Sequence, residues 1–379
     1  MPYNHNFKII NTRSQLLDVT DHLKKEKVIA FDMEADSMFH FREKVCLLQL
    51  ATQSISAIID PLAIRDMSPL KPIFADPEIK KISHGADYDV RSLYRDFSIT
   101  INNLFDTQLA CRFLGIHSTG LDAILKSRLN VAVNKKYQKK DWSQRPLPED
   151  MIKYAAEDVR YLIDLADIME KEIKKKGRLC WVAEECQLLS NVRPSPSDET
   201  WLFLNFKGAG KLSPRKLVLL EALLAFRKSV AQKKDKPLFK IIGNNAINKL
   251  VQEKPLNMQH LKITQALSFS QMRMYGPDII EVIKNAINVP ENKLPVYPRN
   301  KISLMVTEDV SKRINKLKLW RTRKSDKLQI DPSLIFNKTI FKSIAEINPQ
   351  ITEDFSAISG IKNWQKKEFA RDIISVLEQ

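Results

Sequence analysis

The chain of 379 residues is long enough for two or three domains with cores of ordinary size, and its 9 glycines are too few for a fold that depends on glycine-rich phosphate loops. No apolar run approaches the roughly 18 residues that a membrane helix needs, and MPYNHNFKII lacks a signal-peptide pattern, so we expect neither a membrane span nor secretion. Lys and Arg number 29 against 29 Asp and Glu in residues 1–200 but 32 against 16 in residues 201–379, so the net charge of +16 lies in the second half, which predicts contact with a polyanion or, alternatively, a merely solvated basic surface.

The first half alternates between strand and helix patterns. The β-branched and apolar run VIAFDME (Val28–Glu34) is typical of a central strand. Further strands are predicted at Cys46–Thr52, Ser56–Asp60 and Lys80–His84. Apolar residues at three-and-four spacing predict helices at Tyr88–Tyr94, Asp106–Leu114, Leu121–Leu129 and Met151–Ile173. This order predicts an α/β domain, a mixed sheet flanked by helices.

Two acids stand two residues apart on the first predicted strand. Their side chains, those of Asp32 and Glu34, therefore emerge on one face of the sheet, with Phe31 and Met33 on the other. Two like charges 4 Å apart repel by about 4 kcal/mol at an effective dielectric of 20, and a divalent cation would turn that repulsion into attraction. For the pair by itself, a strand end with one acid in solvent would be the favoured interpretation.

Further acids follow at two predicted helix positions. HGADYDVRSL places Asp89 at the start of a helix after a strand, and YAAEDVRYL places Tyr154 and Asp158 at i and i+4, on one helical face. With Asp32 and Glu34 these residues offer four carboxylates, an oxygen donor set that suits Mg²⁺ or Mn²⁺ rather than zinc.

Three short motifs carry a family resemblance. They are FDMEAD (Phe31–Asp36), HGADYD (His84–Asp89) and YAAED (Tyr154–Asp158). In this order and spacing they resemble the DEDD superfamily of 3′→5′ exonucleases, and Tyr154 indicates the tyrosine subclass that contains ribonuclease D. The histidine subclass would need His where this chain has Lys153. The segment LFDTQLACRFLG (Leu104–Gly115) also looks like ribonuclease D.

The resemblance implies a ribonuclease H-like exonuclease domain over residues 1–195 and two-metal phosphodiester hydrolysis to nucleoside 5′-monophosphates. Asp32, Glu34 and Asp158 would hold the ion that activates the attacking water, and Asp32 and Asp89 the ion at the leaving oxygen. Tyr154, with an ordinary pKa of about 10, would orient the water while neutral.

Other residues near the motifs receive structural or substrate interpretations. We expect Asp36, Asp87, Asp106 and Glu157 to be caps or solvated partners. His84 is expected to satisfy a backbone group, because a hard-metal site prefers oxygen. Tyr88 and Met38 are candidates to contact the terminal bases, with core packing as the alternative.

The second half is predicted to be helical. NVRPSPSDET (Asn191–Thr200) is a linker by its Pro and Ser content. Leu212–Leu250 resembles the start of the helicase-and-ribonuclease-D C-terminal (HRDC) domain, and we place this domain at residues 210–291. Residues 303–379 resemble a second, diverged copy of the same domain. Its closing turn and helix are predicted at Ile358–Leu377. Both would be small all-α bundles. In the second copy, no clear early helix signature precedes Asn315. Phosphate contacts are expected from Lys233, Lys234, Arg321 and Arg323, with Trp320 as a stacking surface.

The family layout predicts a cytoplasmic 3′→5′ exoribonuclease that trims precursor tRNA or another structured RNA with a 3′ tail, with two divalent ions as cofactors and no obligate protein partner. Two alternatives stay open: an exonuclease acting on DNA 3′ ends, and an inactive nucleic-acid-binding scaffold. A reducing compartment fits the cysteines, which lack both a C-x-x-C pair and a histidine at zinc spacing: Cys46, Cys111, Cys180 and Cys186.

Overall fold

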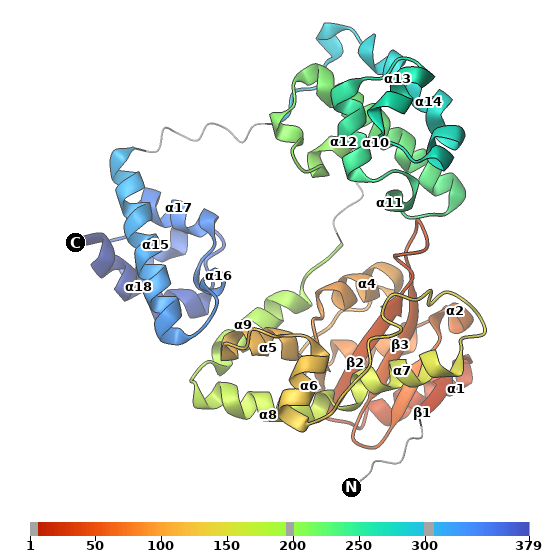
Figure 1. Ribbon diagram of the computed structural model, residues 1–379. Helices are drawn as coiled ribbons and strands as arrows, with labels where there is room; N and C mark the ends of the chain where they lie inside the picture. The colour runs from red at the N-terminus through yellow and green to blue at the C-terminus, as the bar shows by residue number, and fades with distance from the viewer. Residues whose placement is uncertain (1–6, 195–200, 299–306, 379) are drawn as a thin grey trace. The chain divides into compact units, whose positions relative to one another are not determined.

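The computed structural model describes residues 7–194, 201–298 and 307–378. They form two compact units (Figure 1), one containing residues 7–35, 45–194 and 307–378 and the other containing residues 36–44 and 201–298. Residues 195–200 of the predicted linker and residues 303–306 of the predicted third domain lie outside the described residues. Among the helices that the structure describes, none has the length and apolar character to cross a membrane.

The first unit is built on a six-stranded mixed sheet, which confirms the predicted α/β class. Its strands in spatial order are β1 (Phe7–Ile10), β4 (Ser56–Ile59), β3 (Val45–Ala51), β2 (Val28–Ala35), β5 (Lys80–Ser83) and β6 (Leu104–Asp106). β3 is antiparallel to both of its neighbours, and the other pairs are parallel. The four predicted strands are confirmed. Sequence reasoning missed β1 and β6, because strands of four and three residues are too short to show a period.

Helices cover both faces of this sheet. They are α1 (Arg13–Leu23), α2 (Pro61–Ile64), α3 (Lys71–Ala75), α4 (Asp87–Phe97), α5 (Thr107–Leu114), α6 (Leu121–Leu129), α7 (Glu149–Arg160), α8 (Leu162–Lys175) and α9 (Leu179–Ser190), with the 3₁₀ turn η1 (Ser68–Leu70). Apolar residues of α1, α3 and α4 pack against Phe31 and Met33 on one face. α5 and α8 share a core with Ala30 and Ala51 on the other face.

Two helix predictions in this unit need correction. The predicted helix Asp106–Leu114 begins one residue later, because Asp106 ends β6 and caps α5 by accepting from Leu109 N at 2.9 Å. The single predicted helix Met151–Ile173 is two helices, since the backbone leaves helical geometry at Tyr161. The apolar period continues across this break, so sequence alone could not locate it.

The C-terminal helices belong to the same compact unit as the sheet. They are α15 (Glu308–Leu328), α16 (Pro332–Ile335), α17 (Lys338–Ile347) and α18 (Asn363–Glu378), with the 3₁₀ turn η5 (Thr352–Ala357). α15 begins well before Asn315, because Thr307 supplies an N-cap that the sequence analysis did not recognise. Trp320 of α15 is 9% exposed and packs on Phe336 and Phe369, so the expectation that it offers a stacking surface is wrong.

α9 joins these C-terminal helices to the sheet. The Glu184 carboxylate accepts from the backbone N–H groups of Asn363 and Trp364, both at 2.8 Å, and so satisfies the N-terminus of α18. The Glu185 carboxylate accepts from Trp364 Nε1 at 2.9 Å, and the Trp364 ring stacks on Trp181 with centroids 4.7 Å apart. Helix α18 is therefore fixed to α9 of the sheet-containing unit by packing and by hydrogen bonds.

Gly115 gives a test of this close packing. It ends α5 at φ +82, and a Cβ there would lie 2.1 Å from the carbonyl oxygen of Gln329. Gly177 has φ +67, and a Cβ added to it would meet no atom of the described residues within 4 Å, which makes it a matched control for left-handed strain. We expect Gly115→Ala to destabilise the protein by about 1–3 kcal/mol more than Gly177→Ala, measured by urea unfolding. Equal losses would contradict this contact.

The second unit is a helical bundle. Its elements are η2 (Leu202–Asn205), η3 (Ala209–Lys211), α10 (Pro214–Lys234), α11 (Leu238–Ile241), α12 (Asn244–Glu253), α13 (Met258–Thr264), α14 (Phe269–Ile287) and η4 (Glu291–Lys293). The order of a 21-residue helix, a four-residue helix, a ten-residue helix and a long closing helix recurs in α15–α18, although the seven-residue helix α13 before the closing helix is replaced there by the 3₁₀ turn η5. The recurrence agrees with the diverged duplication suggested by the sequence.

Candidate active site

β2 places the first two acids. Asp32 and Glu34 lie opposite Gln49 and Leu47 of β3, and Phe31 and Met33 point into the core on the other face. The register shifts between Glu34 and Ala35, the last residue of β2. Strand alternation therefore puts both carboxylates on the face that α7 covers.

The other two acids come from helices. Asp89 lies in the first turn of α4 and is buried, and Ser83 Oγ at the end of β5 donates to its Oδ2 at 3.3 Å. Tyr154 and Asp158 lie one turn apart on α7, and each side chain affects the pKa of the other. The five motif residues thus come from β2, α4 and α7.

The pKa values of the carboxylates indicate that these acids form one electrostatic cluster. Burial raises the pKa of Glu34 to about 10, with further contributions from the charges of Asp32, Asp158 and Asp89. Burial raises the pKa of Asp32 to about 7, and burial together with the Asp32 charge raises the pKa of Asp158 to about 8. The pKa of Asp89 is raised for the same two reasons. Each acid is poorly solvated and repelled by a neighbour, which a bound cation would offset.

The donor set fits a hard divalent ion, because it consists of carboxylate oxygens whose ionised forms need a compensating charge. Among the described residues, no group of three or more Asp, Glu, His or Cys side chains is arranged so that it could hold a metal ion as it stands. The chemistry of the cluster, rather than a set of ligand distances, therefore indicates the metal.

This cluster predicts how the metal-free protein responds to pH. Folding raises the pKa of the Glu34 carboxyl to about 10. Such a group favours the folded state most at a pH below its pKa in the unfolded chain. This stabilisation is lost as the pH rises from the unfolded-state pKa to the folded-state pKa. In EDTA at pH 8, Glu34→Gln should therefore raise Tm by at least about 2–4 °C, and the gain should vanish near pH 4. A lower Tm for Glu34→Gln at pH 8 would contradict the electrostatic description.

Aromatic side chains hold Tyr154 in place. Its ring contacts Tyr137 and the buried Trp142, with centroid distances of 5.8 and 6.1 Å. Arg145 fixes the segment that carries these rings, because it donates to Asp60 at 2.7 and 2.8 Å and to the Trp142 carbonyl at 2.8 Å. Sequence reasoning missed Trp142 and Tyr137, since they lie in a segment without periodicity between two motifs.

The nearby acids serve the structure. Asp106 caps α5 and also accepts from the N–H groups of Gly85 and Ala86. Asp87 pairs with Arg91, as expected for a solvated partner.

His84 confirms its predicted role by bonding the Thr119 carbonyl at 2.8 Å. Glu157 is exposed on α7, one residue before Asp158.

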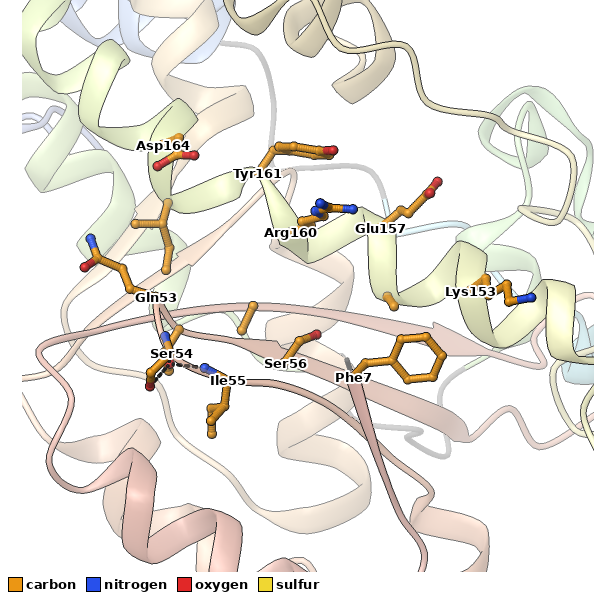
Figure 2. A pocket seen from close by; sticks show the side chains of 14 residues that line it. Phe7, Gln53, Ser54, Ile55, Ser56, Lys153, Glu157, Arg160, Tyr161 and Asp164 are labelled. Carbon is orange, nitrogen blue, oxygen red and sulfur yellow. Dashed lines mark hydrogen bonds between the residues drawn. The ribbon is translucent and has the colours of Figure 1, made fainter. Parts of the chain in front are cut away.

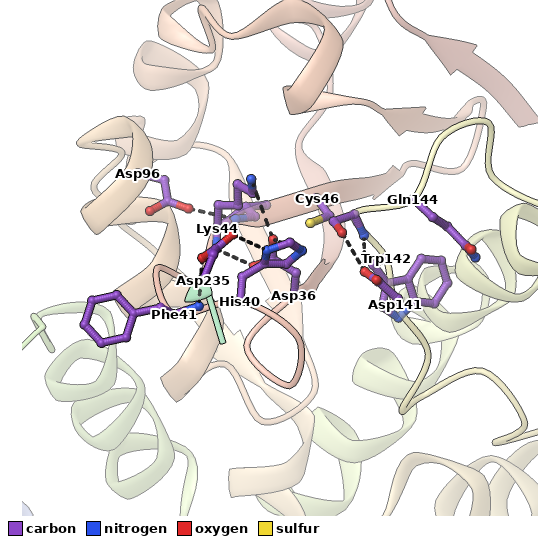
Figure 3. A network of polar contacts seen from close by, with 12 residues as sticks. Asp36, His40, Phe41, Lys44, Cys46, Asp96, Asp141, Trp142, Gln144 and Asp235 are labelled. Carbon is purple, nitrogen blue, oxygen red and sulfur yellow. Dashed lines mark hydrogen bonds and ion pairs between the residues drawn. The ribbon is translucent and has the colours of Figure 1, made fainter. Parts of the chain in front are cut away.

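Asp36 is buried, so the expectation that it is solvated is wrong. Figure 3 shows its network in segment 36–44: its Oδ1 accepts from the Lys44 N–H at 2.8 Å, and its Oδ2 lies 3.9 Å from Lys44 Nζ. In the same network Asp235 of the bundle accepts from the Phe41 N–H and bonds the His40 ring at 2.7 Å. Segment 36–44 is therefore held by the helical bundle.

The predicted substrate-binding residues are distributed over several elements. Met38, in segment 36–44, is 46% exposed, and Tyr88, beside Asp89 on α4, is 41% exposed. Lys233 and Lys234 are exposed at the end of α10.

Arg323 is exposed on α15, whereas Arg321 donates to the Phe336 carbonyl at 3.0 Å and lies over the Phe341 ring. Arg321 thus already has structural partners.

A cavity of about 360 Å³ (Figure 2) has none of the four carboxylates and not Tyr154 in its lining. It is lined by Phe7, the turn 51–56 and the side chains of α7 and α8 from Lys153 to Asp164. Its α7 residues Lys153 and Glu157 precede Tyr154 and Asp158 by one position and so occupy a neighbouring face of the helix. The cavity is distinct from the carboxylate cluster.

Comparisons with known proteins agree with this geometry. A family model described as 3′-5′ exonuclease matches residues 7–174, and a model described as HRDC domain matches residues 216–283 and 311–377. Ribonuclease D of Haemophilus influenzae is 30% identical over 292 residues, which are 76% of this chain and 73% of that protein. Human exosome complex component 10 is 33% identical over 259 residues, and the match covers 66% of this chain but 29% of the human protein.

A solved structure extends the match to almost the whole chain. The crystal structure of Escherichia coli RNase D, described as an exoribonuclease involved in structured RNA processing, aligns with a TM-score of 0.74 and 25% identity. The alignment covers 98% of this chain and 99% of that one. Both helical bundles are therefore part of the shared architecture.

Proposed function

The chain belongs to the ribonuclease D family of 3′→5′ exoribonucleases, and on that premise we propose that it removes nucleoside 5′-monophosphates from RNA 3′ ends at Asp32, Glu34, Asp89 and Asp158. The observation that carries the proposal is the cluster of four mutually repelling carboxylates on β2, α4 and α7. Such a cluster destabilises the fold unless it binds a cation. The family match indicates that the bound cation would support phosphodiester hydrolysis.

The resemblance to the exonuclease family supports an assignment of ligands for two divalent ions, Mg²⁺ or Mn²⁺. Asp32, Glu34 and Asp158 would hold one ion, and Asp32 with Asp89 the other. When bound, the pair would lower the pKa of the attacking water and stabilise charge on the leaving oxygen. The contribution of Ser83 is to keep Asp89 oriented through its hydroxyl.

Tyr154 is assigned a positioning role. Burial and the charge of Asp158 raise its pKa above the usual value, so the phenol keeps its proton at neutral pH and acts as a hydrogen-bond donor rather than as a base. The contacts with Trp142 and Tyr137 restrict its ring, which favours a fixed direction for that donor.

The basic second half supports a polyanionic substrate. Residues 201–379 carry 32 Lys and Arg against 16 Asp and Glu, and Lys233, Lys234 and Arg323 are exposed. Such charges bind the phosphate backbone without reading sequence, which suits a processing enzyme that meets many RNAs. We propose precursor tRNA or another structured RNA with a 3′ tail as the substrate, and the cytoplasm as the compartment, which the four free cysteines suit.

The test compares matched RNA and DNA. The purified chain would be incubated in Mg²⁺ with end-labelled tRNA that bears a 3′ extension and with single-stranded DNA of the same sequence. We expect the RNA extension to be shortened stepwise, faster than the DNA. Faster trimming of DNA would establish the DNA alternative, and binding of both without release from either would establish the scaffold alternative.

A further inference from the structure

Gln49 is a buried polar residue in the middle of the catalytic sheet. In β3 it pairs directly with Asp32 of β2, and its side chain points to the same face, because its neighbours Leu48 and Leu50 pack into the core on the opposite face. Directly opposed side chains in an antiparallel pair have Cβ atoms about 4.5–5.5 Å apart. The Gln49 amide is thus within side-chain reach of the Asp32 carboxylate.

The surroundings of Gln49 offer few other partners. Its side chain is fully buried, and neither Oε1 nor Nε2 makes a hydrogen bond with any residue that the structure describes. Along the same face of β3 its neighbours are Leu47 and Ala51, and on β4 the residue opposite is Ile58. A buried amide without a partner is unfavourable and marks a ligand or a functional state that supplies one. The polar group directly across the strand pair is the Asp32 carboxylate.

We propose that Gln49 is a positioning residue, whose Nε2 donates a hydrogen bond to the Asp32 carboxylate when that carboxylate is ionised and holds a divalent ion. This hydrogen bond would use carboxylate lone pairs of Asp32 that do not contact the ion. It would thereby fix the direction of the lone pairs that bind the ion. Groups that orient metal ligands in this way commonly change metal affinity by about 10–100-fold. This inference rests on the proposed function, because it assumes that Asp32 is a metal ligand.

The test uses metal-dependent stability of the full chain rather than activity alone. Gln49→Met keeps the volume and removes the amide. Thermal unfolding would be followed during a MgCl₂ titration that starts from metal-free protein. For Gln49→Met we expect the Mg²⁺ concentration at half-maximal stabilisation to rise by about tenfold or more, while the Tm without metal is unchanged or higher. Nucleotide release from RNA should fall at low Mg²⁺ and recover at high Mg²⁺.

Gln365 provides a matched control. It is also a buried glutamine, but its Nε2 already donates to the backbone carbonyls of Leu334 and Ile335 at 3.1 and 2.7 Å. Gln365→Met should therefore lower the metal-free Tm and leave the Mg²⁺ midpoint unchanged. If Gln49→Met behaves like Gln365→Met, with a lower metal-free Tm and an unchanged midpoint, Gln49 is structural and the inference is overturned.

A second variant covers the case in which Gln49→Met does not fold. Gln49→Asn shortens the side chain by one methylene and should also raise the Mg²⁺ midpoint. An unchanged midpoint in Gln49→Asn overturns the inference.

Two results for the wild type separate this inference from the proposed function. A wild-type protein that neither Mg²⁺ nor Mn²⁺ stabilises would overturn the proposed metal site, and this inference with it. A wild type that responds normally beside an equally responsive Gln49→Met overturns the role of Gln49 alone.

Discussion

Asp32→Asn is expected to reduce Mg²⁺-dependent nucleotide release from a 3′-tailed RNA by at least about 10³-fold, because Asp32 is the ligand proposed to be shared by both ions. The loss corresponds to about 4 kcal/mol of transition-state stabilisation. RNA affinity should be nearly unchanged, since the excess positive charge lies in residues 201–379. Single-turnover release and equilibrium RNA binding, measured in the same buffer, check the two parts separately.

Glu157→Gln is the matched control for this substitution. Glu157 is an exposed acid on α7 next to Asp158, and it lines the separate cavity rather than the carboxylate cluster. It should keep nucleotide release within about threefold of the wild type, an effect below about 1 kcal/mol. Undiminished release by Asp32→Asn would remove Asp32 from the site, and an equal loss in Glu157→Gln would mean that the effect is not specific to the cluster.

Trp364→Ala is expected to destabilise the protein by about 3–5 kcal/mol, the range for removal of a large buried aromatic side chain. Trp364 is 3% exposed, stacks on Trp181 of α9 and donates to Glu185. Because this contact joins α18 to α9, the destabilisation should reach the exonuclease core. In urea unfolding, the step that ends nucleotide release should therefore shift to a lower midpoint.

Leu319→Ala controls for a large-to-small change in the same set of helices. Leu319 lies on α15 and is 61% exposed, so its removal should change stability by less than about 0.5 kcal/mol. A Trp364→Ala protein that unfolds in two steps, with the step that ends nucleotide release unshifted, would mean that α15–α18 form an independent domain.

Much of the fold could be predicted from local patterns. The apolar run Val28–Glu34 and the three-and-four spacing in Leu121–Leu129 were enough to locate a strand and a helix within about one residue. β1 and β6 could not be found, because their stability comes from pairing with β4 and β5 rather than from their own residues. The break at Tyr161 was missed for a related reason, since both α7 and α8 bury apolar residues on the same side of the sheet.

For the candidate site, sequence could identify the acids but not their supports. Asp32, Glu34, Asp89 and Asp158 follow strand and helix spacing, which a sequence displays directly. The orientation of the Tyr154 ring depends on its contact with Trp142, which lies in a segment without periodicity. Such long-range contacts cannot be read from the spacing of residues along the sequence. The burial of Trp320 was similarly hidden, because its basic neighbours suggest a surface while its ring faces the bundle core.

The carboxylate cluster is proposed to hydrolyse RNA from the 3′ end. The most direct measurement follows RNA labelled at its 5′ end, with the released products identified by chromatography. We expect a ladder that shortens one nucleotide at a time from the 3′ end, products that are nucleoside 5′-monophosphates, and no release in EDTA or by Asp32→Asn. Immediate loss of the 5′ label, internal fragments or nucleoside 3′-monophosphates would contradict this claim.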